Sequence, residues 1–210
     1  AVFFDPADDA FIVSSRHQDV VAKLDATTGE IAWLLGPHEG WGSPWSDDLL
    51  TPVGEVEWPN HQHAPMITPH GTLLLFDNGT NRGGPHAEGP PASQKYSRAV
   101  EYAIDEAAMQ VREVWSYGSG PGERFYSSFI SDADWMPTTE NVLITAGGLI
   151  TDDDGVAIEP NGRRSAVILE VTHETPAAKV FELEVRGDWP VGGWHVYRAE
   201  RVPSLYGGAR

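Results

Sequence analysis

The sequence predicts an all-β protein built of β-propeller blades, and three observations support this class. First, 22 glycines and 16 prolines divide the 210 residues into short runs rich in Val, Ile, Leu, Phe, Tyr and Trp, which is typical of many short strands. Second, these runs come in groups of four, separated by turns short enough for hairpins. Third, the group of four recurs along the chain, as four-stranded antiparallel meanders do in propellers.

The first predicted blade covers residues 1–36. We expect its four strands at residues 2–4, 10–15, 20–25 and 31–35. The connections between them are rich in Asp, Thr, Gly and Pro, which are the residues that favour tight turns. Neighbouring strands joined by such short turns pair antiparallel, so this blade is predicted to be a simple meander.

Two further blades repeat this order, at about residues 60–118 and 126–186. Trp33, Trp115 and Phe181 occupy the same place on the fourth strand of their blades, which indicates a true repeat unit. We therefore assign Trp33 and Trp115 to packing between blades. The expected strands are 63–67, 72–77, 99–105 and 111–117 in the second blade, and 129–135, 142–146, 166–171 and 179–185 in the third.

Three blades and a last predicted strand at 194–202, within a closing segment at 193–203, make about half of a six-bladed propeller. Closed propellers need four to eight blades. We therefore expect residues 1–210 to be one propeller region and a fragment of a larger chain. The ring would then be completed by further residues, by a second chain or by a homo-oligomer. A compact three-bladed arrangement or a β-sandwich is the alternative.

Composition excludes several classes of partner and site. The chain has 31 acidic and 14 basic residues, a net charge of −17, which repels polyanions and argues against nucleic-acid binding. No apolar run reaches the roughly 18 to 20 residues of a membrane helix, so we expect no membrane contact. The absence of cysteine excludes disulfides, thiolate metal sites and cysteine catalysis.

Two long loops, at residues 36–60 and 78–97, are expected to cover one face and shape a site. The strongest polar signal follows the first loop, where His61 and His63 flank the start of a predicted strand. Because alternate residues of a strand share a side, both histidines are predicted to face the channel mouth. A metal site would need a third ligand, such as His17 or His38. The simpler reading is one exposed loop histidine and one that hydrogen-bonds inside the blade.

Arg16 and His17 close the second predicted strand of the first blade. An arginine at a strand end can hold an oxyanion through two parallel hydrogen bonds. The alternative is an ordinary surface ion pair with Asp19 or Asp8, which would contribute little.

Three further residues are candidates for contact with a ligand. Trp58 lies in the long loop before His61, where its ring could stack on an aromatic group. Asn78 and Arg98 lie at the two ends of the second loop. The turn chemistry of Asn-Gly explains Asn78 by itself, and the alternative for Arg98 is an ion pair with Glu101 or Asp77.

Several stretches together resemble the bacterial arylsulfotransferases, also called arylsulfate sulfotransferases. The resemblance follows chain order through most of residues 1–150. It rests on FDPADDAFIVSSRHQ at 4–18, QH at 62–63, FDNG at 76–79, KYSRAVEY at 95–102 and VWSYG at 114–118.

The resemblance implies a six-bladed propeller exported to the periplasm. It implies transfer of a sulfuryl group from a phenolic sulfate ester to a phenolic acceptor, without a nucleotide donor, metal or other cofactor. It further implies that His63 is the nucleophile that becomes sulfated and that Arg16 holds the sulfate. His17, His61, Trp58, Asn78 and Arg98 are then expected to bind substrate.

The chemistry suits these residue types. A neutral imidazole is nucleophilic near pH 7, and its N-sulfo adduct is reactive enough to pass the group on. The sulfuryl oxygens gather charge as the bond to the phenol breaks, so a fixed arginine stabilises them.

Two other functions stay open from the sequence. Residues 22–33 also resemble a blade of the quinone-cofactor (PQQ) dehydrogenases, which predicts a calcium ion and a quinone. The other alternative is a propeller without catalysis that binds a partner through its loops.

Overall fold

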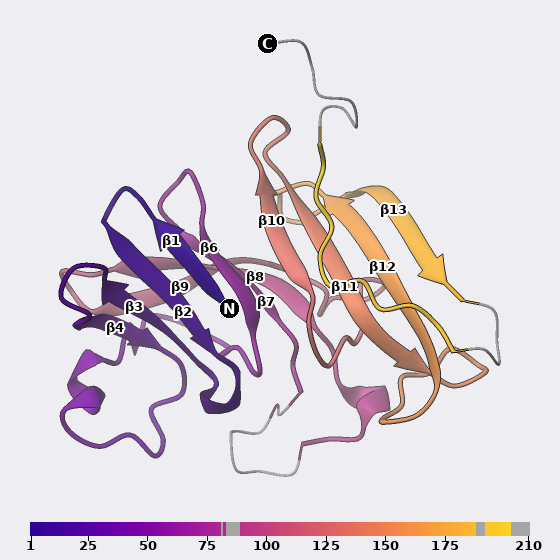
Figure 1. Ribbon diagram of the computed structural model, residues 1–210, viewed down its shortest axis with the longest axis horizontal. Coiled ribbons are helices and arrows are strands. Elements are labelled where there is room, and N and C mark those ends of the chain that lie inside the picture. The colour runs from indigo at the N-terminus through magenta and orange to yellow at the C-terminus, as the bar shows by residue number, and fades with distance from the viewer. Residues whose placement is uncertain (81, 83–88, 188–191, 203–210) are drawn as a thin grey trace.

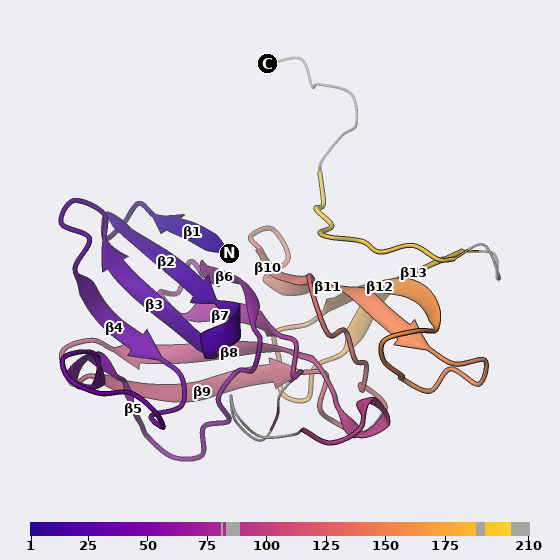
Figure 2. The same cartoon turned by 60° about the horizontal axis from the view of Figure 1, so that its bottom comes forward.

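The computed structural model describes residues 1–80, 82, 89–187 and 192–202, and these residues form three β-sheets and no α-helix. The sheets follow one another in the sequence and stand side by side, with the second between the other two (Figure 1, Figure 2). The predicted class, all-β with propeller-like blades, is confirmed. The described residues contain no helix that is long and apolar enough to span a bilayer.

Sheet 1 is the predicted meander. Its strands are β1 (Val2–Asp5), β2 (Ala10–Ser15), β3 (Val20–Asp25) and β4 (Ile31–Leu35), each antiparallel to the next. The turn between β2 and β3 contains a short 3-10 helix, η1 (Arg16–Gln18). β1 is the innermost strand, because it contacts the innermost strand of sheet 2.

Sheet 2 has one strand more than predicted. The expected four are β6 (His63–Ile67), β7 (Leu73–Asp77), β8 (Arg98–Asp105) and β9 (Gln110–Tyr117). The loop at 36–60 adds β5 (Thr51–Pro52), which pairs parallel to the outer edge of β9. The sequence gives no strand signal for β5, because two residues that contain a proline carry no alternation.

Sheet 3 comprises β10 (Asp132–Met136), β11 (Asn141–Thr151), β12 (Arg163–Val171) and β13 (Lys179–Arg186). All neighbours are antiparallel. β11 and β12 extend beyond the predicted bounds, past a bulge between Ala146 and Leu149. The prediction ended β11 at residue 146 because glycines follow at 147–148, and glycine normally signals a break in a strand.

Two apolar cores join the sheets face to face. Ile12 and Trp33 of sheet 1 pack against Leu75 and Tyr102 of sheet 2, and all four are almost completely buried. The other face of sheet 2, including Leu74, joins a second core with sheet 3. Shortening one of these leucines to alanine costs about 2–5 kcal/mol. The middle sheet is therefore buried on both faces, as an inner blade must be.

The two end sheets carry apolar side chains that are exposed rather than packed against sheet 2. Phe4 and Phe11 pair across β1 and β2 and are 47% and 38% exposed. On β13, Val180, Phe181 and Leu183 are 40–55% exposed. The long loop after β4 covers only part of sheet 1, where Trp41 packs near Leu34. These surfaces match the apolar outer faces expected for end blades.

Residues 192–202 form no strand, although we predicted a closing strand at 194–202. The segment runs in an extended path across sheet 3 (Figure 1). Val196 N–H donates to Gly147 O, and Ala199 N–H donates to the Thr145 hydroxyl. A ladder needs successive backbone partners on a neighbouring strand, and a bond to a side chain does not continue one.

Candidate active site at one edge of the sheets

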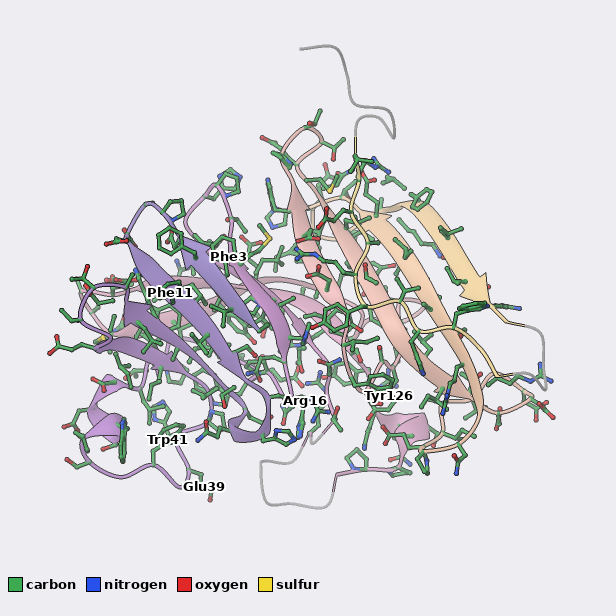
Figure 3. All side chains as sticks on the ribbon, in the orientation of Figure 1. Phe3, Phe11, Arg16, Glu39, Trp41 and Tyr126 are labelled. Carbon is green, nitrogen blue, oxygen red and sulfur yellow. The ribbon has the colours of Figure 1, made fainter. Side chains whose placement is uncertain are left out.

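Four connecting segments from the three sheets meet at one edge. They are the β2–β3 turn, the approach to β6, the residues after β7 and the approach to β10. Figure 3 shows Arg16 from sheet 1 near Tyr126, which precedes sheet 3, at this edge. The positive charge of Arg16 and the Tyr126 phenol are close enough to influence each other. Residues from distant parts of the sequence are thus brought into one polar cluster.

The segment at residues 127–131, sequence SSFIS, connects these side chains. Its carbonyls accept hydrogen bonds from sheets 1 and 2, while Ile130 and Ser131 adopt positive φ angles of 51° and 84°. A positive φ is unfavourable for both residue types, and the surrounding bonds hold it in place. The donors are Arg16 Nη2 to Ser128 O at 3.0 Å, Thr80 Oγ1 to Ser128 O at 2.9 Å, Asn78 Nδ2 to Ser127 O at 2.7 Å and to Ile130 O at 3.0 Å, and His63 Nδ1 to Ser131 O at 2.7 Å.

His63 begins β6, and its bond to the Ser131 carbonyl fixes which ring nitrogen carries the hydrogen. Because a carbonyl only accepts, Nδ1 must carry the hydrogen, which leaves a lone pair on Nε2. Burial lowers the pKa of His63, and the charges of Arg16 and Arg198 contribute to the same effect. The imidazole is therefore neutral at pH 7, with Nε2 available as a nucleophile.

A cavity of about 360 Å³ opens beside His63. Its lining includes Ser131, Asp132, Tyr197 and Arg198. The Tyr197 hydroxyl lies 3.2 Å from His63 Nε2. With the hydrogen on Nδ1, the Tyr197 hydroxyl donates to Nε2 at the border of this cavity.

Arg16 is half-buried at the end of β2, near the Asp19 carboxylate and the Tyr126 phenol. Burial lowers the pKa of its guanidinium, while Asp19 opposes this effect. An arginine stays charged at neutral pH even so. Glu159 accepts a hydrogen bond from Tyr126 at 3.1 Å and pairs with Lys95 at 3.3 Å. The cluster thus offers two cations within a small region of an acidic protein.

His61 and His63 do not project together, contrary to the prediction from alternation. His61 precedes β6 and has a positive φ of 52°, so the strand period does not apply to it. Its backbone N–H donates to Asp19 Oδ1 at 2.5 Å, and its ring meets His17 edge-on, with ring centroids 5.8 Å apart. Burial, with the charges of Arg16 and His17, lowers the pKa of His61 to about 4. His61 and His17 therefore lie with Asp19 against sheet 1, whereas His63 faces sheet 3.

Arg98 has a structural position rather than the ligand-binding position that we predicted. Only 2% of it is exposed. Its nitrogens bond Asp77 Oδ2 at 3.0 Å, Glu113 Oε1 at 2.8 Å and the Glu57 carbonyl at 2.8 Å. With its donors engaged inside the blade, the guanidinium has no means of reaching a ligand.

Trp58 and Asn78, which we predicted to bind substrate, both contact other parts of the protein. Trp58 packs against the core between sheets 1 and 2 and stacks on His38, with centroids 5.9 Å apart. Asn78 supports the 127–131 segment, and its buried Oδ1 has no hydrogen-bond partner in the part of the chain that the structure describes. Asn78 thus positions the segment that both Arg16 and His63 contact.

Several residues of this edge escaped the sequence reasoning. Thr80, Ser131 and Tyr197 are common residue types in no recognisable motif, and only the fold brings them near His63 or Arg16. Within the described ranges, no group of three or more His, Asp or Glu side chains is arranged to hold a metal ion.

Comparison with known proteins gives one consistent result. A sequence model of the family described as Arylsulfotransferase (ASST) matches residues 1–198. The chain is 33% identical over 208 aligned positions to Arylsulfate sulfotransferase AssT of Escherichia coli O6:H1 strain CFT073, covering 90% of this chain and 33% of that protein. The AssT protein of Lelliottia amnigena is 32% identical over 206 positions, with the same coverage. The chain therefore spans about a third of the length of these relatives.

Proposed function

Because the chain belongs to the arylsulfotransferase family, we propose that it carries the sulfuryl-transfer site of an aryl sulfate sulfotransferase, with His63 as nucleophile. The observation that carries this proposal is the 2.7 Å contact between His63 Nδ1 and the Ser131 carbonyl. It selects the tautomer that leaves the lone pair on Nε2, at the border of the cavity. The relatives are named for arylsulfate sulfotransfer, which supports the same reaction here.

The reaction proceeds in two displacements at sulfur. In the first, His63 Nε2 attacks the sulfur of a phenolic sulfate ester, an N–S bond forms, the S–O bond breaks and a phenolate leaves. In the second, the oxygen of an acceptor phenol attacks the same sulfur, the N–S bond breaks and the phenol loses its proton to solvent. A neutral imidazole serves both steps, because it is nucleophilic and leaves readily as a neutral group.

Arg16 has the proposed role of holding the sulfuryl oxygens. The group carries negative charge throughout, and charge shifts among its oxygens as the S–O bond stretches. A guanidinium fixed in place stabilises that charge without reorganising during the reaction. Its bond to Ser128, three residues from the carbonyl that holds His63, supports this role. His17 and His61, which lie beside Arg16, are proposed to bind donor or acceptor.

We further propose phenols and their sulfate esters as substrates and the periplasm, or the exterior of the cell, as the location. Both follow the family resemblance. The family match favours sulfuryl transfer over a quinone-dependent dehydrogenase. Further blades, from the same polypeptide or another, are proposed to complete the ring at the exposed outer faces of sheets 1 and 3.

The direct test is to incubate the protein with 4-nitrophenyl sulfate and follow nitrophenolate release. Fragmentation of the labelled protein should place a sulfuryl group on His63. His63→Ala should lose both nitrophenolate release and label. His70→Ala is the matched control, because His70 is an exposed turn residue whose ring rests on Trp135. Full turnover by His63→Ala, or label on His61 or His17 alone, would reject His63 as the nucleophile.

A further inference from the structure

The phenol hydroxyl of Tyr197 lies beside Nε2 of His63, the proposed nucleophilic atom. The hydroxyl lies 3.2 Å from His63 Nε2, and the two rings meet edge-on with centroids 5.4 Å apart. Tyr197 belongs to the segment 192–202 that crosses sheet 3, seen on one side of that sheet in Figure 2. The side chain is 62% exposed, so burial does not force the hydroxyl against His63.

The neighbours of Tyr197 hold this part of the segment on sheet 3. Val196 N–H donates to Gly147 O at 3.1 Å on one side. On the other side, Arg198 pairs with Asp132 at 2.6 Å and with Asp134 at 3.0 Å. Anchors on both sides restrict the backbone at residue 197. This holds the hydroxyl close to His63 Nε2.

The Tyr197 hydroxyl lies where the attacking oxygen of an acceptor phenol has to be. In the second displacement the attacking phenol oxygen approaches sulfur on the side opposite Nε2, in line with the breaking N–S bond. The Tyr197 hydroxyl already faces Nε2 across a gap of 3.2 Å. A small outward movement of the ring would make room for a sulfuryl group between the two atoms. Tyrosine is itself a phenol with an ordinary pKa of about 10, so it belongs to the acceptor class.

We propose that Tyr197 is an intramolecular sulfuryl acceptor, which receives the group from His63 and becomes a tyrosine O-sulfate when no free phenol is present. The inference rests on the proposed function, because it requires a sulfated His63. The N–S bond to Nε2 breaks, an S–O bond forms to the Tyr197 oxygen, and the phenolic proton passes to solvent. A donor whose phenol is more acidic than tyrosine, such as 4-nitrophenyl sulfate, drives this transfer forward.

The consequence is a chain that accepts sulfuryl groups at two positions. The first group moves from His63 to Tyr197 and restores a free imidazole. A second donor then sulfates His63 again. Without added phenol, the wild-type chain should therefore release about two equivalents of nitrophenolate in its fast phase, before slow hydrolysis, whereas an ordinary covalent mechanism releases about one.

The experiment compares the fast-phase amplitude in the wild type, Tyr197→Phe and His63→Ala with 4-nitrophenyl sulfate alone. Peptide fragmentation then locates the sulfuryl groups. We expect about two equivalents in the wild type with tyrosine sulfate at 197, about one in Tyr197→Phe with label on His63 only, and none in His63→Ala. Tyr197→Phe keeps the ring, so packing is preserved, and circular dichroism confirms that each variant is folded.

Three results would overturn the inference. Equal amplitudes of one equivalent in the wild type and Tyr197→Phe, with label on His63, would reject Tyr197 as an acceptor and leave the proposed function intact. Label on Tyr197 in His63→Ala would reject the intramolecular route. The absence of any burst and of any label on His63 in the wild type would reject both the inference and the proposed function.

Discussion

Arg16 and His63 each bond a backbone carbonyl of the same short segment, Ser128 O at 3.0 Å and Ser131 O at 2.7 Å. One residue comes from sheet 1 and the other from sheet 2, while the segment leads into sheet 3. The relative position of a proposed sulfate-holding cation and a proposed nucleophile is therefore set by five residues that belong to neither of their sheets. A side chain held in this way is ready before substrate binds, which is the condition for electrostatic catalysis.

Replacement of Arg16 should slow sulfuryl transfer without unfolding the protein. Arg16→Gln keeps a hydrogen-bond donor for Ser128 but removes the charge, so we expect a loss of about 100-fold in the burst rate, or about 3 kcal/mol. Arg112→Gln, an exposed position on β9, is the control and should react at the wild-type rate. Single-turnover rates separate transfer from donor binding. A rate in Arg16→Gln equal to that of the control would remove Arg16 from the mechanism.

The burst rate should depend on pH through His63. Only the neutral imidazole attacks sulfur, and burial lowers the pKa of this group below its ordinary value of about 6.5. The rate should therefore fall as the pH is lowered, with a midpoint below about pH 6.5. Stopped-flow measurement of nitrophenolate release across pH 4.5–8 tests this, with the usual correction for the absorbance of nitrophenol. A midpoint above pH 7 would contradict the environment described for His63.

Arg98 should matter for stability and not for chemistry. Arg98→Met removes one of the two cations from a buried network, so that Glu113 loses its cation while Asp77 keeps Arg82 at 2.8 Å. We expect a loss of about 3–5 kcal/mol in the free energy of unfolding. Urea denaturation measures that loss, and the folded fraction should keep the wild-type burst rate and donor affinity. A change in donor affinity without a change in stability would restore Arg98 as a ligand contact.

The exposed strand β13 should promote association of the chain. Val180 and Leu183 are about half exposed. Exposed apolar side chains on an edge strand favour association with another sheet. We expect the double variant Val180→Glu, Leu183→Glu to sediment as a smaller species than the wild type at equal concentration. Val114→Glu changes a similarly exposed residue on β9 and should leave sedimentation unchanged. Identical sedimentation of all three chains would rule out β13 as a contact surface.

The sequence predicted the strands more successfully than the site. Alternation and turn residues located all twelve blade strands to within a few residues, because burial of one face imposes a period that survives in a single sequence. Tertiary placement has no such period. Alternation placed His61 beside His63 and was wrong, since a left-handed backbone at His61 ends the period just before β6. Arg98 was a ligand candidate because it lies at the end of the second loop. Of its partners, Asp77 was the alternative that the sequence offered, whereas Glu57 and Glu113 become neighbours only when the sheet pairs.

The 127–131 segment leads into sheet 3 but is held by donors from sheets 1 and 2, and this limits how the blades can be recombined. A chimera that takes sheet 3 from a relative also takes its own version of this segment, yet the donors Arg16, Asn78 and His63 stay with the host. A loop of different length or backbone angle would still allow each sheet to fold, because the cores between the sheets do not include it. Such a hybrid would be a stable protein with a misaligned site. For a functional exchange of blades, the chain therefore has to be cut before Tyr126. Asn78 and its turn must at the same time be matched to the segment that is brought in.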